Sequence, residues 1–273
     1  MDPSSRESYA PALARLNELA AAKGSGLAGA ADEILSVAEV LGREPRLRRA
    51  LADPSRPGEE RAALLDSVIT GKVSGDAAEL LRMLAGGRWS SGVQLLNATE
   101  RLGVQALLAS AQAADELAEV EDELFRFGQM VDGDLRLAAA LGASTVPPAQ
   151  RAELARSLLD GKARPATVRL VIAALYGFGG RGFSAGLRAI VELAAYRRER
   201  EIAYVTVAAP LSESEMTRLA TRLTEIYGRA VEVKVTVAPE VLGGVSVRVG
   251  HDLYDGTVRR RLADTRAALA AKK

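Results

Sequence analysis

The fold of the C-terminal part of this chain is decided by one stretch, Val241–Leu262, which reads VLGGVSVRVGHDLYDGTVRRRL. After the glycine pair Gly243-Gly244, every second residue of Val245–Val249 is a valine. Alternation with a period of two places those valines on one face of a strand, so that face is expected to be buried. Asp255-Gly256 is expected to end the strand, and residues 256–270, which are rich in arginine and alanine, predict a closing helix.

Two further strands and a helix are predicted just before this stretch. Ala203–Ala208 and Val231–Val237 carry alternating valines, which is typical of half-buried strands. Between them, Ser212 and Glu215 form a capping box, in which each side chain satisfies a backbone N–H group of the other residue. The order strand, helix, strand, strand, helix predicts a small α/β domain at residues 202–273.

The chain before residue 200 is predicted to be helical. Ser8 is expected to cap the first helix, in which apolar residues recur every three or four positions until Gly24 ends it. Two long helices are predicted at Gly92–Leu108 and Ala185–Arg200. Leucine and alanine dominate these stretches, which favours a helical bundle.

An internal repeat lies within this helical region. Glu33–Lys72 aligns without a gap to Glu123–Lys162, at an offset of 90 residues and with 12 identities in 40 positions. Each copy contains a proline that suits the start of a helix and a Gly-Lys pair that suits its end. The repeat therefore predicts one short helix in each copy, at Pro57–Thr70 and at Pro147–Asp160.

The fold class that follows is mainly α, with a duplicated N-terminal helical bundle and a small C-terminal α/β domain. We expect the first bundle at residues 1–113, the second at 114–201 and the α/β domain at 202–273. The second copy has no first helix of its own. Our hypothesis is that residues from about 101 to 118 both close the first bundle and open the second.

The composition argues against several classes of protein. The 273 residues carry a net charge of +1, which gives no overall electrostatic signal for nucleic acid. Cysteine is absent and there is one histidine, so thiolate and histidine-rich metal sites are not expected. The start of the chain shows no secretory signal and no stretch has the length of a membrane helix, so we expect a soluble cytoplasmic protein. Phosphate-binding, serine-hydrolase and zinc-protease motifs are all missing, so neither a catalytic site nor a cofactor is predicted.

Two of these patterns resemble one known family, the delta subunit of F-type ATP synthases, called the oligomycin-sensitivity conferral protein in mitochondria. One is the succession of Gly-Gly, strand, Asp-Gly and arginine-rich helix in Val241–Leu262. The other is the first helix, where SYAPALARLNELA resembles the family's Tyr-Ala-x-Ala-Leu pattern at Tyr9, Ala10, Ala12 and Leu13. Family members typically carry a single N-terminal bundle, so the second copy is a departure.

The resemblance implies a non-catalytic connector in the peripheral stalk, or stator, of an ATP synthase. It implies that the helical part binds the N-terminal helix of an alpha subunit and that the C-terminal part binds the C-terminal end of a b-type stalk. It further implies a place at the cytoplasmic face of the bacterial plasma membrane, held there only through the complex. The candidate partner-binding residues are Tyr9, Ala10, Ala12, Leu13, Gly243, Gly244, Asp255, Gly256 and Arg259.

Two other functions remain open at this point. One is a free-standing helical-repeat adaptor between proteins, which would fit the duplicated bundle equally well. The other is an enzyme with a phosphate-containing ligand, for which Gly243-Gly244 and the arginine cluster Arg259–Arg261 would supply anion-binding groups. The helical pattern alone does not separate the stator connector from the adaptor.

Overall fold

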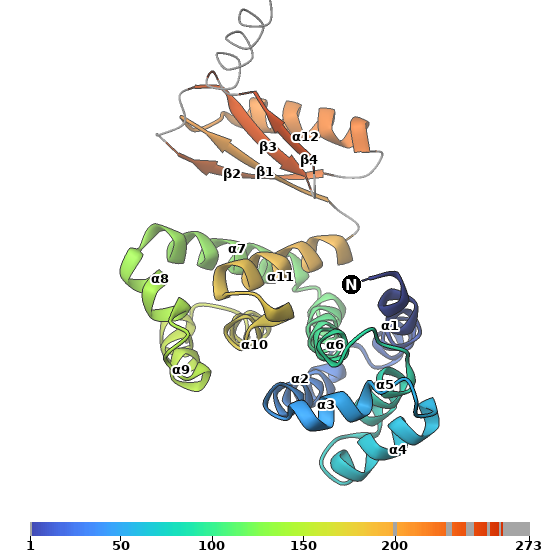
Figure 1. Ribbon diagram of the computed structural model, residues 1–273. Helices are drawn as coiled ribbons and strands as arrows, with labels where there is room; N and C mark the ends of the chain where they lie inside the picture. Colours follow the sequence, from blue (N-terminus) through green and yellow to red (C-terminus); the bar gives the residue numbers. More distant parts are fainter. Residues whose placement is uncertain are drawn as a thin grey trace, which may run out of the picture. The chain divides into compact units, whose positions relative to one another are not determined.

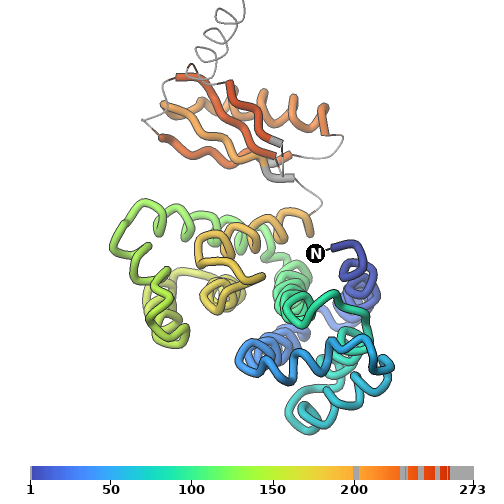
Figure 2. The backbone as a smooth tube through the Cα atoms, viewed as in Figure 1, coloured from blue at the N-terminus to red at the C-terminus, as the bar shows by residue number. Residues whose placement is uncertain are grey.

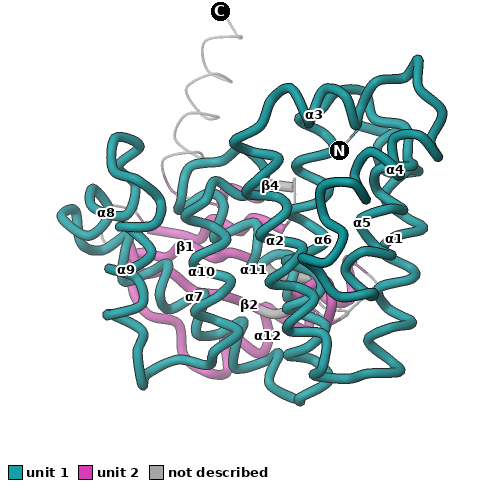
Figure 3. The backbone as a smooth tube through the Cα atoms, turned by 90° about the horizontal axis from the view of Figure 1, so that it is seen from below, with its two compact units in different colours: residues 1–194 teal, residues 195–273 magenta. Residues whose placement is uncertain are grey.

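The computed structural model describes residues 2–198, 201–227, 231–238, 243–249, 252–256 and 258. The internal contacts divide the chain into two compact units, residues 1–194 and residues 195–273 (Figure 3). Unit 1 is helical, and unit 2 contains a sheet and a helix (Figure 1). The predicted fold class, mainly α with a duplicated helical bundle and a small C-terminal α/β domain, is confirmed.

Unit 1 contains two successive sets of helices, which Figure 2 traces along the chain. The first set is α1 (Pro3–Lys23), α2 (Ala28–Arg43), α3 (Pro45–Leu51), α4 (Gly58–Ile69), α5 (Gly75–Gly86) and α6 (Gly92–Ala113), with a 3-10 turn η1 (Gly24–Leu27) after α1. The second set is α7 (Leu117–Gly133), α8 (Leu135–Gly142), α9 (Pro148–Leu159), α10 (Pro165–Leu175) and α11 (Phe183–Arg197), with a 3-10 turn η2 (Phe178–Gly180) after α10. When 90 is added to the residue numbers of α2–α6, the resulting ranges overlap those of α7–α11 in the same order.

The repeat fixes the ends of α4 and α9 in the same way. Pro57 and Pro147 stand just before these helices with nearly equal backbone angles, φ −54° and ψ 148° against φ −52° and ψ 138°. After each helix comes a glycine in the left-handed region, Gly71 at φ 74° and Gly161 at φ 65°, a conformation that favours glycine. The helices predicted at 57–70 and 147–160 are therefore confirmed, each one residue shorter at both ends.

Helix α6 is the most extensively buried element of unit 1. Every residue from Leu102 to Ala111 is buried, so this stretch has no solvent-facing side. It contacts α1, α2 and α3 of the first set, and also α7, α10 and η2 of the second set. An α-helix that is buried all round must have neighbours on all sides, and α6 has them because both sets pack against it (Figure 1).

Unit 2 is a four-stranded mixed sheet with one described helix. Its elements are β1 (Glu201–Val207), α12 (Glu213–Tyr227), β2 (Val231–Val237), β3 (Val245–Val249) and β4 (Asp252–Asp255), and the strand order is β2-β1-β3-β4. β1 pairs in parallel with β2 and antiparallel with β3. The valines of β1, β2 and β3 share one face, where they pack with Leu219 and Leu223 of α12.

Two details of the predicted fold need correction or lie outside the structure. The sequence predicted one strand in Val245–Val249 and no other before Gly256, whereas Asp252–Asp255 forms β4 and pairs antiparallel with β3. A four-residue segment with an acid at each end has little strand signal of its own, and its ladder depends on β3 as a partner. The closing helix predicted at residues 256–270 falls almost wholly outside the described residues.

Candidate partner-binding surfaces

The first helix begins earlier than predicted, because Asp2 and not Ser8 caps it. The Asp2 carboxylate accepts a hydrogen bond from the Ser5 backbone N–H at 2.8 Å, and Pro3 occupies the first helical position. Ser8 lies inside the helix and bonds the chain that follows α5. Its Oγ donates to the Arg88 carbonyl at 2.7 Å and accepts from the Arg88 N–H at 2.9 Å.

The four motif residues of α1 do not share one face. Tyr9 and Ala12 are buried, with 6% and 0% of their surface exposed, and so belong to the core. Ala10 is exposed and Leu13 is half-buried. Only Ala10 and Leu13 are therefore available to a partner in this conformation, and Tyr9 and Ala12 support the helix that presents them.

Ion pairs connect α1 to α5 on a different side of α1. The Arg15 guanidinium donates to both carboxylate oxygens of Glu79, with Nε at 2.7 Å from Oε1 and Nη2 at 3.3 Å from Oε2. Lys23 Nζ lies 2.6 Å from Asp76 Oδ2. The hydrogen bond from Arg15 lowers the pKa of Glu79 below its usual range. Leu13 precedes Arg15 by two residues, or about 200° around the helix, so Leu13 points away from α5.

The candidate residues of unit 2 lie where the backbone turns. Gly243 and Gly244 have φ angles of 68° and 87°, which L-residues with a side chain rarely adopt. The Gly256 N–H donates to the Val245 carbonyl at 2.9 Å, and a Cβ on Gly256 would lie 3.1 Å from that oxygen. These three glycines are therefore required by the backbone.

The two charged candidates of unit 2 differ in what the structure describes. Asp255 ends β4, where it is paired with Ser246, and it is exposed. It is thus the only exposed side chain among the candidates of unit 2 that the structure describes. Arg259 lies outside the described residues.

A cleft in unit 1 contains a half-buried carboxyl group that the sequence did not single out. Glu100 of α6 accepts a hydrogen bond from the Gly179 backbone N–H of η2 at 2.7 Å. Burial raises the pKa of Glu100 to about 7. One glutamate on a long helix carries no signal in a sequence, because its burial depends on α10 and η2, which lie about 75 residues further along.

None of the helices that the structure describes combines the length and the hydropathy needed to cross a membrane.

Comparisons with known proteins agree over nearly the whole length. The family model for the ATP synthase delta (OSCP) subunit matches residues 6–98 and 104–269, two stretches separated by residues 99–103 of α6. A protein from Salinispora arenicola named ATP synthase subunit delta is 60% identical over 269 residues, which cover 98% of each chain. Its namesake in Streptomyces griseus is 41% identical over 270 residues, covering 99% of this chain and all of the relative.

A solved structure matches a smaller part of the chain. It is a chain of the mitochondrial ATP synthase hexamer of Toxoplasma gondii, with 19% identity and a TM-score of 0.39, covering 61% of this chain and 94% of that chain. The near full-length sequence matches decide the assignment without it. The chain belongs to the ATP synthase delta (OSCP) subunit family.

Proposed function

We propose that this chain is the stator connector of an F-type ATP synthase, a subunit without catalytic activity. The observation that supports this is the match, over 98–99% of this chain, to proteins named ATP synthase subunit delta. A free-standing adaptor would not be expected to keep 60% identity over 98% of its length to such a protein. The connector would be a peripheral component of a membrane-bound complex, at the cytoplasmic face of the bacterial plasma membrane.

The partners follow from the division into two units. Unit 1 would bind the N-terminal helix of an alpha subunit on the exposed side of α1, where Ala10 and Leu13 are accessible. Ala10 carries only a methyl group, which lets another helix approach α1 closely. Unit 2 would bind the C-terminal end of the b-type stalk. Each contact in this arrangement needs to be no larger than a standard protein interface of about 1,600 Å².

The action of such a connector is mechanical. Rotation of the central shaft exerts torque on the catalytic head, and a connector that yielded would dissipate the work taken from the proton gradient. What the chain must supply is stiffness between two binding surfaces. In unit 1 this stiffness comes from α6, which is buried on all sides between residues 102 and 111.

The proposal is tested by calorimetry with two synthetic peptides from the same organism, one for the N-terminal helix of its alpha subunit (the alpha peptide) and one for the C-terminal end of its b-type stalk (the b peptide). Both should bind the full chain, each with a stoichiometry that the other peptide does not change. Ala10→Glu places a charge on the proposed surface of α1 and should weaken binding of the alpha peptide at least about tenfold, with binding of the b peptide unaffected. Ala63→Glu is the matched control, because Ala63 is also an exposed alanine within a helix, α4. Failure of both peptides to bind at tens of micromolar would refute the proposal.

A further inference from the structure

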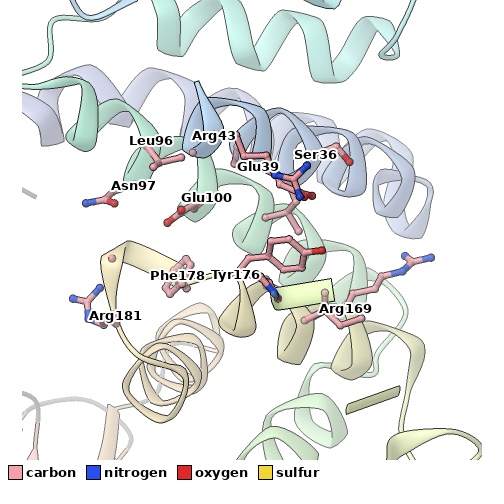
Figure 4. A pocket seen from close by; sticks show the side chains of 18 of the residues that line it. Ser36, Glu39, Arg43, Leu96, Asn97, Glu100, Arg169, Tyr176, Phe178 and Arg181 are labelled. Carbon is pink, nitrogen blue, oxygen red and sulfur yellow. The ribbon is translucent and has the colours of Figure 1, made fainter. Parts of the chain in front are cut away.

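Unit 1 contains a cleft of about 870 Å³ between the two sets of helices. Its walls are α2 and α10, α6 forms its floor, and η2 closes one end (Figure 4). Glu100 on α6 faces this space, and its Oε2 accepts the Gly179 N–H of η2 at 2.7 Å. This one hydrogen bond therefore joins the floor of the cleft to the turn that closes it.

In each set of helices, a side chain from the first helix holds the turn before the last helix. In the first set, Ser8 of α1 bonds both the N–H and the carbonyl of Arg88, between α5 and α6. In the second set α6 stands in the place of a first helix, and its Glu100 bonds Gly179, between α10 and α11. The two contacts differ in chemistry, because a hydroxyl group stays neutral over the ordinary pH range and a carboxyl group does not.

The turn that Glu100 holds is built largely from glycine. Gly177, Gly179 and Gly180 have φ angles of 94°, 63° and 70°, in the region where glycine moves at little steric cost. The backbone hydrogen bond from the Gly180 N–H to the Gly177 carbonyl, at 2.8 Å, stays within the turn. Phe178 is buried and anchors the middle of the turn. A change at Glu100 would therefore act on a segment that can change its backbone conformation.

Titratable side chains line the cleft from every element around Glu100. They come from α2, α9, α10 and the residue after η2: Asp32, Glu39, Arg43, Arg156, Arg169, Tyr176 and Arg181. Three of the arginines already lie against carboxylates, Arg43 against Glu39, Arg169 against Asp32 at 3.6 Å and Arg156 against Glu153 at 2.7 Å. Arg181 is exposed, and its Nη1 lies 3.5 Å from the Gly179 carbonyl. Within the described residues Glu100 has no ion pair, so water must stabilise its charge.

We propose that the contact between Glu100 and Gly179 is a pH-sensitive latch, closed while Glu100 is protonated and released when Glu100 ionises. A protonated carboxyl group still accepts the Gly179 N–H through its carbonyl oxygen and carries no charge that needs hydration. An ionised carboxylate in the closed cleft has this N–H but lacks part of its water, which an open η2 would restore. Release would widen the cleft at the end that η2 closes. Such a latch would operate whether or not the chain is a stator connector.

The direction of the pH effect follows from the pKa of Glu100. Burial raises it from 4.5 to about 7 in the closed form, and the bond from Gly179 opposes this rise only in part. The closed form therefore keeps a proton that the open form releases between these two values. Closure is fully favoured below about pH 4.5 and is progressively weakened as the pH rises to about 7. The two values limit the effect to about 300-fold, since each unit of pKa is tenfold in an equilibrium.

Hydrogen exchange on the full chain tests the latch, because local opening exposes amides that the closed form protects. Exchange in residues 176–182 is measured at about pH 5.5 and about pH 8, and each rate is divided by the intrinsic rate at that pH. We expect protection to fall at least about tenfold between the two conditions. Glu100→Gln keeps an acceptor for the Gly179 N–H but cannot ionise, so its protection should be equal at both. Ser8→Ala is the matched control in the first set, and should lower protection in residues 87–91 by the same factor at both.

A second measurement needs no variant. The side-chain carboxyl carbon resonance of Glu100 should titrate at the pH where protection of residues 176–182 stops falling. Different pH values for these two events, or a fall that persists in Glu100→Gln, would assign the effect to another group and overturn the latch. Equal protection of the natural chain at both conditions would overturn it as well. Greater protection at about pH 8 would mean that ionised Glu100 holds the turn more tightly, the opposite of the proposed release.

Discussion

The two helical sets of unit 1 agree in how their helices end and differ in how their helices are joined. In the first set, Glu33 Oε2 accepts hydrogen bonds from the Ser74 N–H and Oγ at the start of α5, at 2.8 and 2.6 Å. Ninety residues later, Glu123 Oε2 accepts from the Arg164 N–H at 2.9 Å and from Thr167 Oγ1 at 2.5 Å at the start of α10. The capping glutamate was thus retained in both copies.

The contacts between helices did not stay equivalent. Arg15 pairs with Glu79 in the first set, and the positions 90 residues later hold Gln105 and Arg169. Arg169 turns instead toward Asp32 of α2. The numbering of α6, shifted back by 90, coincides with that of α1, so α6 occupies in the second set the place of a first helix. The residues that start and end helices are thus alike in the two sets. The contacts between helices differ, because the helices of the second set pack against α6.

The largest expected effect comes from substitution within α6. Leu108 is fully buried, and Leu108→Ala should lower the free energy of unfolding by about 2–5 kcal/mol, through lost transfer energy and a residual cavity. Because α6 contacts both sets, hydrogen exchange should accelerate in α2 and in α10 alike. Leu141→Ala in α8 is the local control, since α8 contacts α7 and α9, and its effect should stay within the second set. Loss of protection confined to α2 would mean that α6 belongs to the first set alone.

The second effect is a pH dependence at the contact between α6 and η2, where the two sets meet. Glu100 has its pKa raised to about 7 from 4.5, so between these values the folded chain keeps a proton that the unfolded chain releases. Stability from this group is therefore present below about pH 4.5 and lost as the pH rises to about 7, by at most about 3 kcal/mol. Glu100→Gln should remove this fall. The test is the difference between the urea unfolding free energies of the two proteins at pH 5 and pH 8, and a pH-independent difference would contradict it.

Several features of the fold followed from the sequence because each depends on a few neighbouring residues. The starts of α4 and α9 and the glycines after them were predicted from proline and glycine preferences, and the Ser212–Glu215 capping box forms as expected, with the Ser212 N–H 2.8 Å from Glu215 Oε2. Features that depend on distant residues were missed. β4 forms because β3 is its pairing partner, and the cleft forms because α2 and α10 lie apart from each other.

The candidate site was predictable only in part, for the same reason. The motif on α1 was recognised, but the pattern could not separate the buried Tyr9 and Ala12 from the exposed Ala10, because that depends on where α5 and α6 pack. The identity of Glu33 and Glu123 was visible in the alignment, whereas their capping of α5 and α10 requires the fold. Gly243 and Gly244 were named from the sequence as candidate partner-binding residues, and their positive φ angles give them a role in the backbone itself.

The third prediction compares the two capping glutamates directly. Glu33→Ala and Glu123→Ala should each lower the free energy of unfolding by about 1–2 kcal/mol, because each leaves a backbone N–H at a helix start without its carboxylate acceptor. The loss should be larger for Glu123, whose bond to Thr167 involves a buried side chain. Chemical denaturation of the two variants measures this. Unequal losses in the opposite order would show that the second set no longer relies on its capping glutamate.

The smallest effect is expected at the ion pair that the second set has lost. Arg15 and Glu79 are each more than one third exposed, so solvent screens their attraction and Arg15→Gln should lower the melting temperature only slightly, less so at high salt. Gln105→Arg combined with Arg169→Glu would place the two charges of the first set's pair at the equivalent positions of the second set. Since Gln105 is 4% exposed, the restored pair would have to be desolvated, and the double variant should be less stable than the natural chain. A more stable double variant would contradict this and would mean that the cost of desolvation does not explain why the second set lacks the pair.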